Sequence, residues 1–376
     1  MTGRLQLYDW LHTGDEAFAA MLSAIRAAKT SVRLEMYIYE ASTIGDLFRD
    51  ELVSAARRGL DVRVLIDALG SVTLPYDFWE SFRKAGGQFK WFNRLQFNRL
   101  GLRDHRKILV CDDEIAFIGG FNIAPEYEGD GVTKGWRDLG MVIRSELATD
   151  LSKAFDMMFE LADFKPRRFT KIRKARHQVS VVTEKSKLLL SSPGFSFNLM
   201  KNALYHDLAR ADHVKIVSAY FLPTRRLRRE ILRIRKRGGR VQLVLPAISD
   251  VPFSQMATRS LYRRLLMTGI EIYEYQPQIL HAKMILMPQA AYVGSSNLDV
   301  RSFHSNYELL VRINEPGFIS EGESLFAEIL GHSKAIDLAE WKQSRTFFSK
   351  LMGKWAFLVL AKLDPFLTRQ QLKLLT

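Results

Sequence analysis

The chain has 376 residues, of which 47% are hydrophobic, and its formal net charge is +14 at pH 7. This length exceeds one ordinary core and indicates two domains, and the apolar fraction excludes global disorder. The charge favours anionic partners, either nucleic acid or an acidic membrane surface. The single cysteine, Cys111, excludes an intramolecular disulfide and a cysteine-rich metal site.

The two ends of the chain carry little sign of a membrane span. The segment 1–8 has no long apolar stretch, so we expect neither a signal peptide nor an anchor there. The longest apolar run near either end is 355–361, between Lys354 and Lys362. It is shorter than the roughly 20 residues that a spanning helix needs.

Helical and strand patterns alternate along the first part of the chain. They predict helices over 16–29 and 45–58, and strands over 32–39, 62–68 and 89–92. Gly59 follows the second helix, where a left-handed cap is expected. A strand that begins at His105 and a hairpin return complete this part.

The same order of elements then recurs. Helices are predicted over 198–210, 225–237 and 261–268, and strands over 214–220, 241–245 and 270–275. A second strand opening with a histidine, at His281, and its return follow. The recurrence predicts an α/β fold in two copies, each a mainly parallel or mixed sheet flanked by helices.

The predicted domain boundaries follow the two copies. Residues 1–165 form the first domain and 186–315 the second. Between them, 166–185 is basic and contains Pro166, so it is typical of a solvated linker or exposed edge, and contact with an anionic ligand is the weaker interpretation. Residues 316–376 form a helical C-terminal region after the break at Glu315-Pro316-Gly317.

Each copy contains a His-x-Lys pair, then an apolar run, a patch of small residues and an asparagine. Strand residues two apart face the same way, so each histidine and its lysine are expected to face one pocket. Imidazole can be a nucleophile or a proton carrier, and an ammonium and an amide can hold phosphate. The two sets therefore predict one site for phosphoryl chemistry that is built from both halves. The first set is His105, Lys107, Gly119-Gly120 and Asn122, and the second is His281, Lys283, Gly294-Ser295-Ser296 and Asn297.

An acidic residue follows each asparagine, Asp138 in the first copy and Glu308 in the second. A carboxylate on one imidazole nitrogen fixes the tautomer and stabilises the imidazolium. We interpret Asp138 as the partner of His105 and Glu308 as the partner of His281; an ordinary surface or ion-pair carboxylate is the alternative. One His-x-Lys alone is nearly uninformative, but its recurrence in matching order favours catalytic roles for both histidines.

The pattern His-x-Lys-x4-Asp followed by Gly-Gly-x-Asn resembles the motif of the phospholipase D superfamily. Two copies in this arrangement resemble the bacterial cardiolipin synthases, in the form without N-terminal transmembrane helices. The resemblance implies two tandem phospholipase D-like domains related by a pseudo-twofold axis, with one active site at their interface. The segments that carry the narrower match are Met36-Tyr-Ile-Tyr39, Ile118-Gly-Gly-Phe-Asn122, Ala219-Tyr-Phe-Leu-Pro223 and Val293-Gly-Ser-Ser-Asn-Leu-Asp299.

The resemblance also implies the residues of the site, with no metal and no cofactor. The implied catalytic set is His105, Lys107, Asp112, His281 and Lys283, and the phosphate-binding or orienting set is Asn122, Asn297, Asp138, Glu308 and Ser296. The second copy departs from the family pattern, because Pro288 stands where the motif has an aspartate. This position falls at a hairpin turn, where proline can fix φ, so we interpret its role as structural rather than chemical.

Cardiolipin synthesis is the activity that the resemblance implies. His105 would attack the phosphorus of one phosphatidylglycerol, and His281 would protonate the departing glycerol and then activate a second phosphatidylglycerol. The sequence alone permits the reverse assignment of the two histidines. Three alternatives remain: a phospholipase D with water as acceptor, a nuclease of the same superfamily, and a non-catalytic binding module, which only Pro288 supports.

The implied partners are phosphatidylglycerol, other anionic phospholipids and a membrane surface, with no nucleic acid. We therefore expect a peripheral protein of the bacterial inner membrane. The segment 347–367 mixes aromatic, aliphatic and lysine residues, as an interfacial helix does, although it can instead pack against the second domain. The run 225–240 is densely basic and is either a solvated helix face or an added attraction to acidic lipid.

Overall fold

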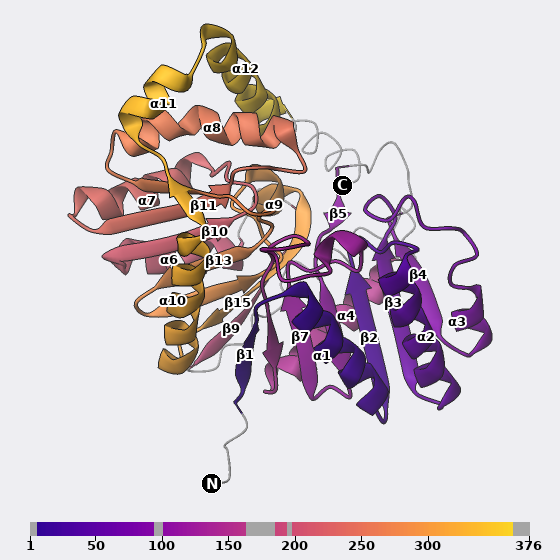
Figure 1. The fold of residues 1–376 in the computed structure, drawn as a ribbon. Helices are drawn as coiled ribbons and strands as arrows, with labels where there is room; N and C mark the ends of the chain where they lie inside the picture. The colour runs from indigo at the N-terminus through magenta and orange to yellow at the C-terminus, as the bar shows by residue number, and fades with distance from the viewer. Residues whose placement is uncertain (1–5, 94–100, 163–184, 194–197, 364–376) are drawn as a thin grey trace.

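The computed structural model describes residues 6–93, 101–162, 185–193 and 198–363 (Figure 1). Of the predicted linker 166–185, only Lys185 falls among them. Two mixed sheets form the frame. The first has the order β1-β8-β7-β6-β2-β3-β4, and its strands are β1 (Tyr8–Leu11), β2 (Ser31–Met36), β3 (Asp61–Asp67), β4 (Gln88–Phe92), β6 (Ile108–Cys111), β7 (Ile115–Gly119) and β8 (Gly140–Ile143).

The second sheet repeats the strand order of the first sheet and has two further strands, one at each end. Its order is β16-β12-β11-β10-β13-β14-β15-β5, and β9 also pairs with β15, as β1 pairs with β8. In both sheets three strands run parallel and the hairpin strands run antiparallel. These strands are β5 (Arg103–Asp104), β9 (Ser186–Ser191), β10 (His213–Ser218), β11 (Arg240–Pro246), β12 (Glu271–Tyr275), β13 (Lys283–Met287), β14 (Ala290–Gly294), β15 (Asn306–Ile313) and β16 (Ser333–Ala335). The predicted α/β fold with a duplicated mixed sheet is confirmed.

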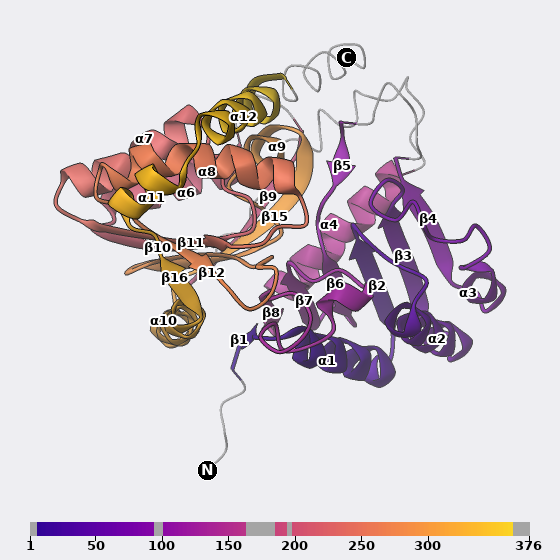
Figure 2. The ribbon, with the colours of Figure 1, turned by 45° about the horizontal axis from the view of Figure 1, so that its top comes forward.

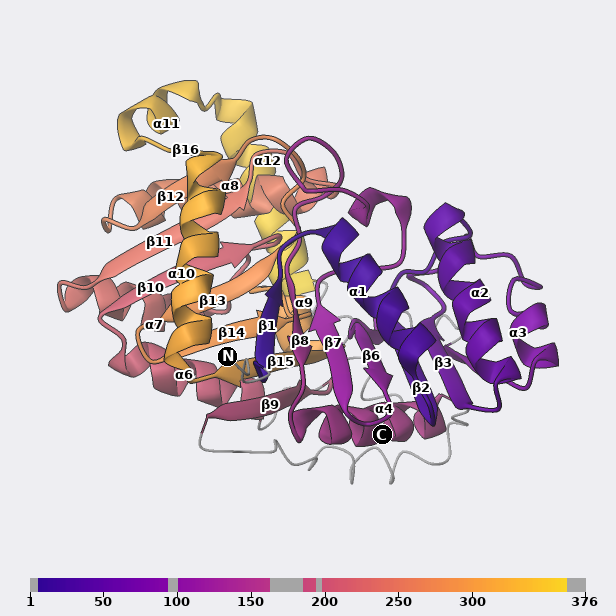
Figure 3. The same ribbon diagram turned by 60° about the horizontal axis from the view of Figure 1, so that its bottom comes forward.

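Helices cover both faces of each sheet (Figures 1 and 3). In the first half, α1 (Gly14–Ala27), α2 (Thr43–Arg57) and α3 (Glu80–Lys84) lie on the outer face, and α4 (Leu147–Leu161) lies on the other. The second half repeats this with α6 (Leu199–Arg210), α7 (Arg225–Lys236) and α8 (Pro252–Leu266) outside and α10 (Pro316–Gly331) inside. The remaining short helices are η2 (Pro125–Tyr127), α9 (Val300–His304), α11 (Leu338–Ser344), α12 (Phe347–Leu358) and the π-helical turn η4 (Val359–Leu363).

Helix α7 shows how local sequence sets such an element. The Thr224 hydroxyl caps it by accepting from the N–H of Leu227 at 3.2 Å. Leu227, Ile231 and Ile234 recur every three or four residues and are buried, whereas most of the arginines between them face outward. The basic run 225–240 is therefore mainly a solvated helix face packed on the sheet by its apolar stripe.

One apolar core joins the two halves. Side chains of β6, β7 and β8 pack with those of β13, β14 and β15 in a single buried cluster. The first strand and α10 close this cluster at the edge: the Trp10 ring stacks on Phe318 at 4.4 Å, and its indole N–H donates to the Phe318 carbonyl at 3.0 Å. Truncating such an aromatic anchor costs about 3–5 kcal/mol, so the interface is part of the fold.

Candidate active site

Main-chain bonds across the interface place the two histidines. His105 lies in the extended link between β5 and β6, and its N–H donates to the carbonyl of Tyr307 at 3.0 Å. His281 lies just before β13, and its N–H donates to the carbonyl of Arg137 at 2.8 Å. Each histidine is thus fastened to the residue that immediately precedes the acidic residue of the opposite half.

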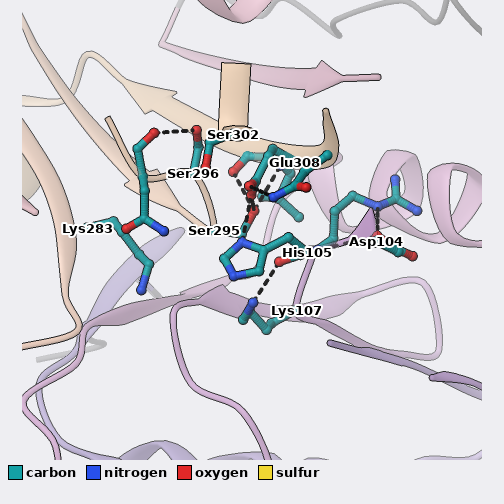
Figure 4. A network of polar contacts seen from close by, with 12 residues as sticks. Asp104, His105, Lys107, Lys283, Ser295, Ser296, Ser302 and Glu308 are labelled. Atoms are coloured by element: carbon teal, nitrogen blue, oxygen red, sulfur yellow. Dashed lines mark hydrogen bonds and ion pairs between the residues drawn. The ribbon is translucent and has the colours of Figure 1, made fainter. Parts of the chain in front are cut away.

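Both acidic residues consequently reach the histidine of the other half. Glu308 Oε2 lies 3.1 Å from His105 Nδ1, as Figure 4 shows, and Asp138 Oδ2 lies 2.6 Å from His281 Nδ1. Our prediction that Asp138 pairs with His105 and Glu308 with His281 is wrong. Asn306 and Tyr307 pair with Arg103 and Asp104, and Arg137 pairs with Leu280, so each carboxylate lies beside the histidine link of the opposite half. Sequence order within one half does not contain these contacts.

The surroundings of the two carboxylates differ in one informative way. Ser295 donates to Glu308 Oε2 at 2.5 Å, and Asn306 donates to Glu308 Oε1 at 3.2 Å. In the first half Gly120 takes the place of Ser295, and a Cβ there would lie 2.1 Å from Asp138 Oδ1. The small-residue patches therefore make room for the carboxylates. Ser295 is a site residue that sequence reasoning did not single out, whereas the Ser296 hydroxyl donates to the Asn297 carbonyl at 3.2 Å.

Both carboxylates are ionised despite full burial. Burial alone raises the pKa of Asp138, but the charge of Lys283 and the contact with His281 outweigh it, so the net shift is downward. Burial likewise raises the pKa of Glu308, and His105 and Lys107 reverse the shift. Each carboxylate can therefore hold the Nδ1 proton of its histidine and direct Nε2 toward the pocket.

Two buried lysines lie beside the two histidines. Lys107 Nζ donates to the His105 carbonyl at 2.7 Å, and Lys283 Nζ donates to the His281 carbonyl and lies 3.1 Å from His281 Nε2. Burial, and then the charge of Lys283, lowers the pKa of Lys107 to about 7. Burial also lowers the pKa of Lys283. A bound anion would relieve both penalties.

The two imidazoles are neutral at pH 7. Burial lowers the pKa of His105, and Glu308 opposes this shift. Burial and then Lys283 lower the pKa of His281 to about 4, although Asp138 opposes them. A neutral imidazole is the form that can attack an electrophilic phosphorus or accept a proton.

Both histidines line one cavity of about 460 Å³ between the halves. Aromatic rings hold them in place: Tyr37 lies 4.8 Å from the His105 ring, and Tyr127 and Trp136 lie 5.4 and 5.5 Å from the His281 ring. Tyr127 belongs to no motif in the sequence, so its place beside His281 is seen only in the folded structure. The expectation of one shared pocket agrees with this arrangement.

The two motif asparagines have different surroundings. Asn122 accepts from the N–H of Ile38 at 3.1 Å and donates to the Tyr127 hydroxyl at 2.6 Å. Asn297 lines the cavity, and its buried side-chain Oδ1 has no hydrogen-bond partner among the described residues. Oxygen and nitrogen of an amide are exchanged by rotation, so Asn297 can turn a donor toward a phosphate.

Buried ion pairs hold the link on either side of His105. Arg103 contacts Asp67 at 3.1 Å, and Arg106 contacts Glu35 at 2.6 Å, all four being almost fully buried. Removing one member of such a pair leaves an uncompensated charge, so these residues keep the link in one conformation.

Asp112 lies outside the cavity, and its assignment to the catalytic set is wrong. Its carboxylate accepts from the N–H groups of Lys29, Thr30 and Ser31 at 2.8–3.1 Å. It therefore ties the β6–β7 turn to the link that enters β2. Asp112 lies outside the cavity because it is in the turn after β6, with φ of 57°, at the end of that strand remote from His105.

The turn at Pro288 is anchored in another way. Gln289 Nε2 donates to the carbonyl of Asp207 near the end of α6 at 3.2 Å. The Asp207 carboxylate in turn accepts from Tyr292 at 2.7 Å and Arg312 at 2.6 Å. The second half thus holds its hairpin to the preceding helix without the motif aspartate, in agreement with our structural interpretation of this position.

Comparison with known proteins gives consistent matches. Residues 21–159 and 204–330 match the family model described as cardiolipin synthase, PLD-like domain. The chain is 29% identical to the cardiolipin synthase of Alkalihalophilus pseudofirmus over 91% of its length and 69% of the relative. It is 31% identical to the major cardiolipin synthase ClsA of Bacillus subtilis (strain 168), over 89% and 71% of the two chains.

A solved structure supports the fold alone. The phosphatidylserine synthase of Haemophilus influenzae Rd KW20 superposes with a TM-score of 0.76 at 17% identity, covering 97% of this chain and 96% of that one. Within the described part of the chain, no helix combines the length and apolarity needed to cross a bilayer.

Proposed function

Because the chain belongs to the cardiolipin synthase family of phospholipase D-like domains, we propose that it is a phosphatidyltransferase that makes cardiolipin and glycerol from two molecules of phosphatidylglycerol. One observation carries the proposal. His105 and His281, each bonded to a carboxylate of the opposite half, line one cavity beside two buried lysines. This arrangement suits two-step transfer of a phosphodiester.

In the first step, His105 Nε2 attacks phosphorus and the bond from phosphorus to the headgroup glycerol oxygen breaks. His281 gives a proton to the departing oxygen, and the phosphatidyl group stays on His105. In the empty cavity His281 is neutral, but a phosphodiester anion offsets the charge of Lys283 and raises the imidazole pKa. The close contact with Asp138 favours the same protonated form.

In the second step, a headgroup hydroxyl of another phosphatidylglycerol gives its proton to His281 and attacks phosphorus. The bond from phosphorus to His105 breaks, and cardiolipin leaves. Lys107, Lys283 and Asn297 would hold the non-bridging oxygens, where charge grows in the transition state. Ser296 and Asn122 remain phosphate-binding candidates whose hydroxyl and amide already have partners in this structure.

The lining of the cavity favours a lipid over a nucleic acid. Leu69, Leu222, Val251, Val300 and Leu360 present apolar surface beside the polar centre. A diacylglycerol moiety can bury acyl carbons against such a wall, whereas a nucleotide chain gains little there. Incubation with phosphatidylglycerol vesicles, followed by mass spectrometry, tests the proposal. Free phosphatidic acid in place of cardiolipin would assign a hydrolase, and cleavage of plasmid DNA would assign a nuclease.

The roles of the two histidines can be separated by the leaving group. A phosphatidyl ester of p-nitrophenol releases a stable anion that needs no proton. We expect this donor to restore phosphohistidine formation in His281→Ala but not in His105→Ala. The reverse pattern of rescue would make His281 the nucleophile.

The lipid substrates also imply where the protein works. We propose peripheral attachment to the bacterial inner membrane, with phosphatidylglycerol and other anionic phospholipids as partners. Support comes from exposed apolar side chains close to the cavity: Val72 and Tyr76 follow Leu69, and Val251 lies at the opposite wall. The division into domains 1–165 and 186–315 is part of the same proposal. Sedimentation with vesicles of bacterial lipids tests the attachment.

A further inference from the structure

A second cavity lies on the outer side of the second half, away from the catalytic residues. It has a volume of about 350 Å³ and lies between α8, α11 and α12. Figure 2 shows these helices together on one side of the second half. Apart from Ser260 and Trp341, all the residues that line it are basic: Arg259, Arg263, Lys342, Arg345, Lys350 and Lys354.

Most of this charge is unbalanced. Arg259 is paired with Glu274 at 2.9 Å, and Arg345 lies over the Trp341 ring at 5.2 Å. Among the described residues, no carboxylate lies within ion-pair distance of the other basic residues, which are exposed: Arg263, Lys342, Lys350 and Lys354. Uncompensated cations gathered around one hollow form a binding site for an anion.

The apolar side of α12 adjoins the basic cavity. Phe347, Leu351, Trp355 and Leu358 recur every three or four residues and are 43–83% exposed. Lysines at 350 and 354 stand next to this stripe on the same helix. Exposed aromatic and aliphatic side chains beside lysines are the composition of a helix that lies in a membrane interface.

A third face of α12 fixes the helix on the protein. Gly353 and Ala356 are buried against α8, and a Cβ at Gly353 would lie 3.1 Å from the carbonyl oxygen of Met256. The helix therefore docks through Gly353, Ala356 and the partly buried Phe357, and it leaves the four large residues of its apolar stripe exposed. Both interpretations of the segment 347–367 hold in part over its described portion, since the helix packs on the second half and also presents an apolar face.

This helix also leads to the catalytic cavity. The Trp355 ring lies 5.4 Å from Phe253, which is two residues from the cavity-lining Val251. Leu360, in the turn that follows α12, lines the catalytic cavity directly. A membrane that receives the apolar face of α12 would therefore lie at the entrance to the active site.

We propose that the basic cavity between α8, α11 and α12 binds the headgroup of an anionic phospholipid molecule other than the two that react in the catalytic cavity, while the apolar face of α12 enters the bilayer. The bound lipid orients the enzyme so that its catalytic cavity opens toward the membrane. This inference rests on the proposed function, which supplies the lipid surface. Its ligand is the phosphate group of a bilayer lipid.

Vesicle sedimentation of the full chain tests the proposal. The variant Arg263→Gln/Lys354→Gln removes two cations from the cavity, and Lys29→Gln/Arg57→Gln removes two exposed cations from the first half. Each basic residue near an anionic leaflet strengthens binding about fivefold. We therefore expect about thirtyfold weaker binding to phosphatidylglycerol vesicles for the first variant and little change for the control, with equal melting temperatures for both.

A second variant separates the two contacts. Phe347→Ser/Leu351→Ser should weaken binding to phosphatidylcholine and phosphatidylglycerol vesicles alike, whereas Arg263→Gln/Lys354→Gln should weaken only the latter. Equal losses for the cavity variant and its control would reduce the effect to net charge and overturn the site. Unchanged binding of the cavity variant would overturn it as well. Because binding is read without turnover, failure to make cardiolipin would count against the proposed function and not against this site.

Discussion

Glu308 lies 203 positions from His105 along the chain and 3.1 Å from its ring. Asp138 and His281 form the equivalent contact, at 2.6 Å. Each half therefore supplies one histidine and the carboxylate that orients the histidine of the other half. An active site of this kind exists only when both halves are folded together.

The contacts across the interface predict which histidine each carboxylate orients. Glu308→Gln removes the charge that orients His105, and Asp138→Asn does the same for His281. We expect each to lower kcat about 10²–10⁴-fold, because the wrong tautomer or orientation then dominates. The p-nitrophenyl donor should rescue phosphohistidine formation in Asp138→Asn and leave Glu308→Gln impaired. Rescue of Glu308→Gln instead would support our original prediction, in which each carboxylate orients the histidine of its own half.

Asn297 is predicted to bind the phosphate. Asn297→Ala should lower kcat/KM about 10²–10³-fold, the usual effect of losing one donor to a developing charge. Asn122 is already bonded to Ile38 and Tyr127, so Asn122→Ala should also lower the melting temperature. Steady-state kinetics and thermal unfolding of both variants check this contrast, which would fail if Asn297→Ala lost stability and kept activity.

Gly120→Ala tests the space that Asp138 occupies. The added Cβ would lie 2.1 Å from the carboxylate, so Asp138 must move away from His281. We expect a loss of kcat of about 10²-fold or more and a destabilisation of about 1–3 kcal/mol. Gly331→Ala, at the end of α10, serves as the control, because an added Cβ there meets no atom within 4 Å. Full activity in Gly120→Ala would mean that the carboxylate position is unimportant.

Asp112→Ala should weaken the fold and spare the chemistry. The carboxylate accepts several backbone N–H groups, and its loss leaves them partly unsatisfied at a cost of about 1–3 kcal/mol. Burial raises the pKa of Asp112, but these bonds outweigh it and the net shift is downward. The contribution is thus present above the unfolded pKa and is lost on acidification. Urea unfolding at pH 7, with kcat per folded molecule, measures both effects; a large fall in kcat would return Asp112 to the catalytic set.

The pH dependence of stability follows from His281. Its pKa is about 4 in the folded chain and 6.5 when unperturbed. Between these values the unfolded chain binds the additional proton, so the free energy of unfolding rises with pH and falls by about 1.4 kcal/mol per unit on acidification. Asp138, whose pKa is lowered, adds its own loss only below about pH 4. Denaturant titrations from pH 4.5 to 7 should show a smaller slope for His281→Gln, and equal slopes would contradict the assignment.

Much of this protein was predictable from sequence periodicity. The parallel strands and their helices carry long apolar patterns. The predicted range lies within one residue of the observed ends for β3 and within two for α2. The strands that were missed are short or lie at edges. Among the strands that the structure describes, β1 pairs with β8 alone, and β5 contributes two residues to a sheet of the other half. Such strands are defined by long-range partners that a local pattern does not contain.

The site was predictable by residue type and only partly by geometry. Recurrence located both histidines, both lysines and the asparagines, since these positions follow one order in each copy. Pairing of Glu308 with His105 depends on how the halves dock, and Ser295 acquires its role from that docking. Asp112 differs from these residues, because it belongs to the motif and yet binds the backbone beside its turn rather than the cavity.

The stacking of Trp10 on Phe318 carries one more consequence. The N-terminal strand of the described chain packs on α10 of the second half, so this contact opposes separation of the two halves. In the proposed two-step transfer, glycerol leaves before the second phosphatidylglycerol attacks. Initial rates measured against donor and acceptor should accordingly give parallel double-reciprocal lines.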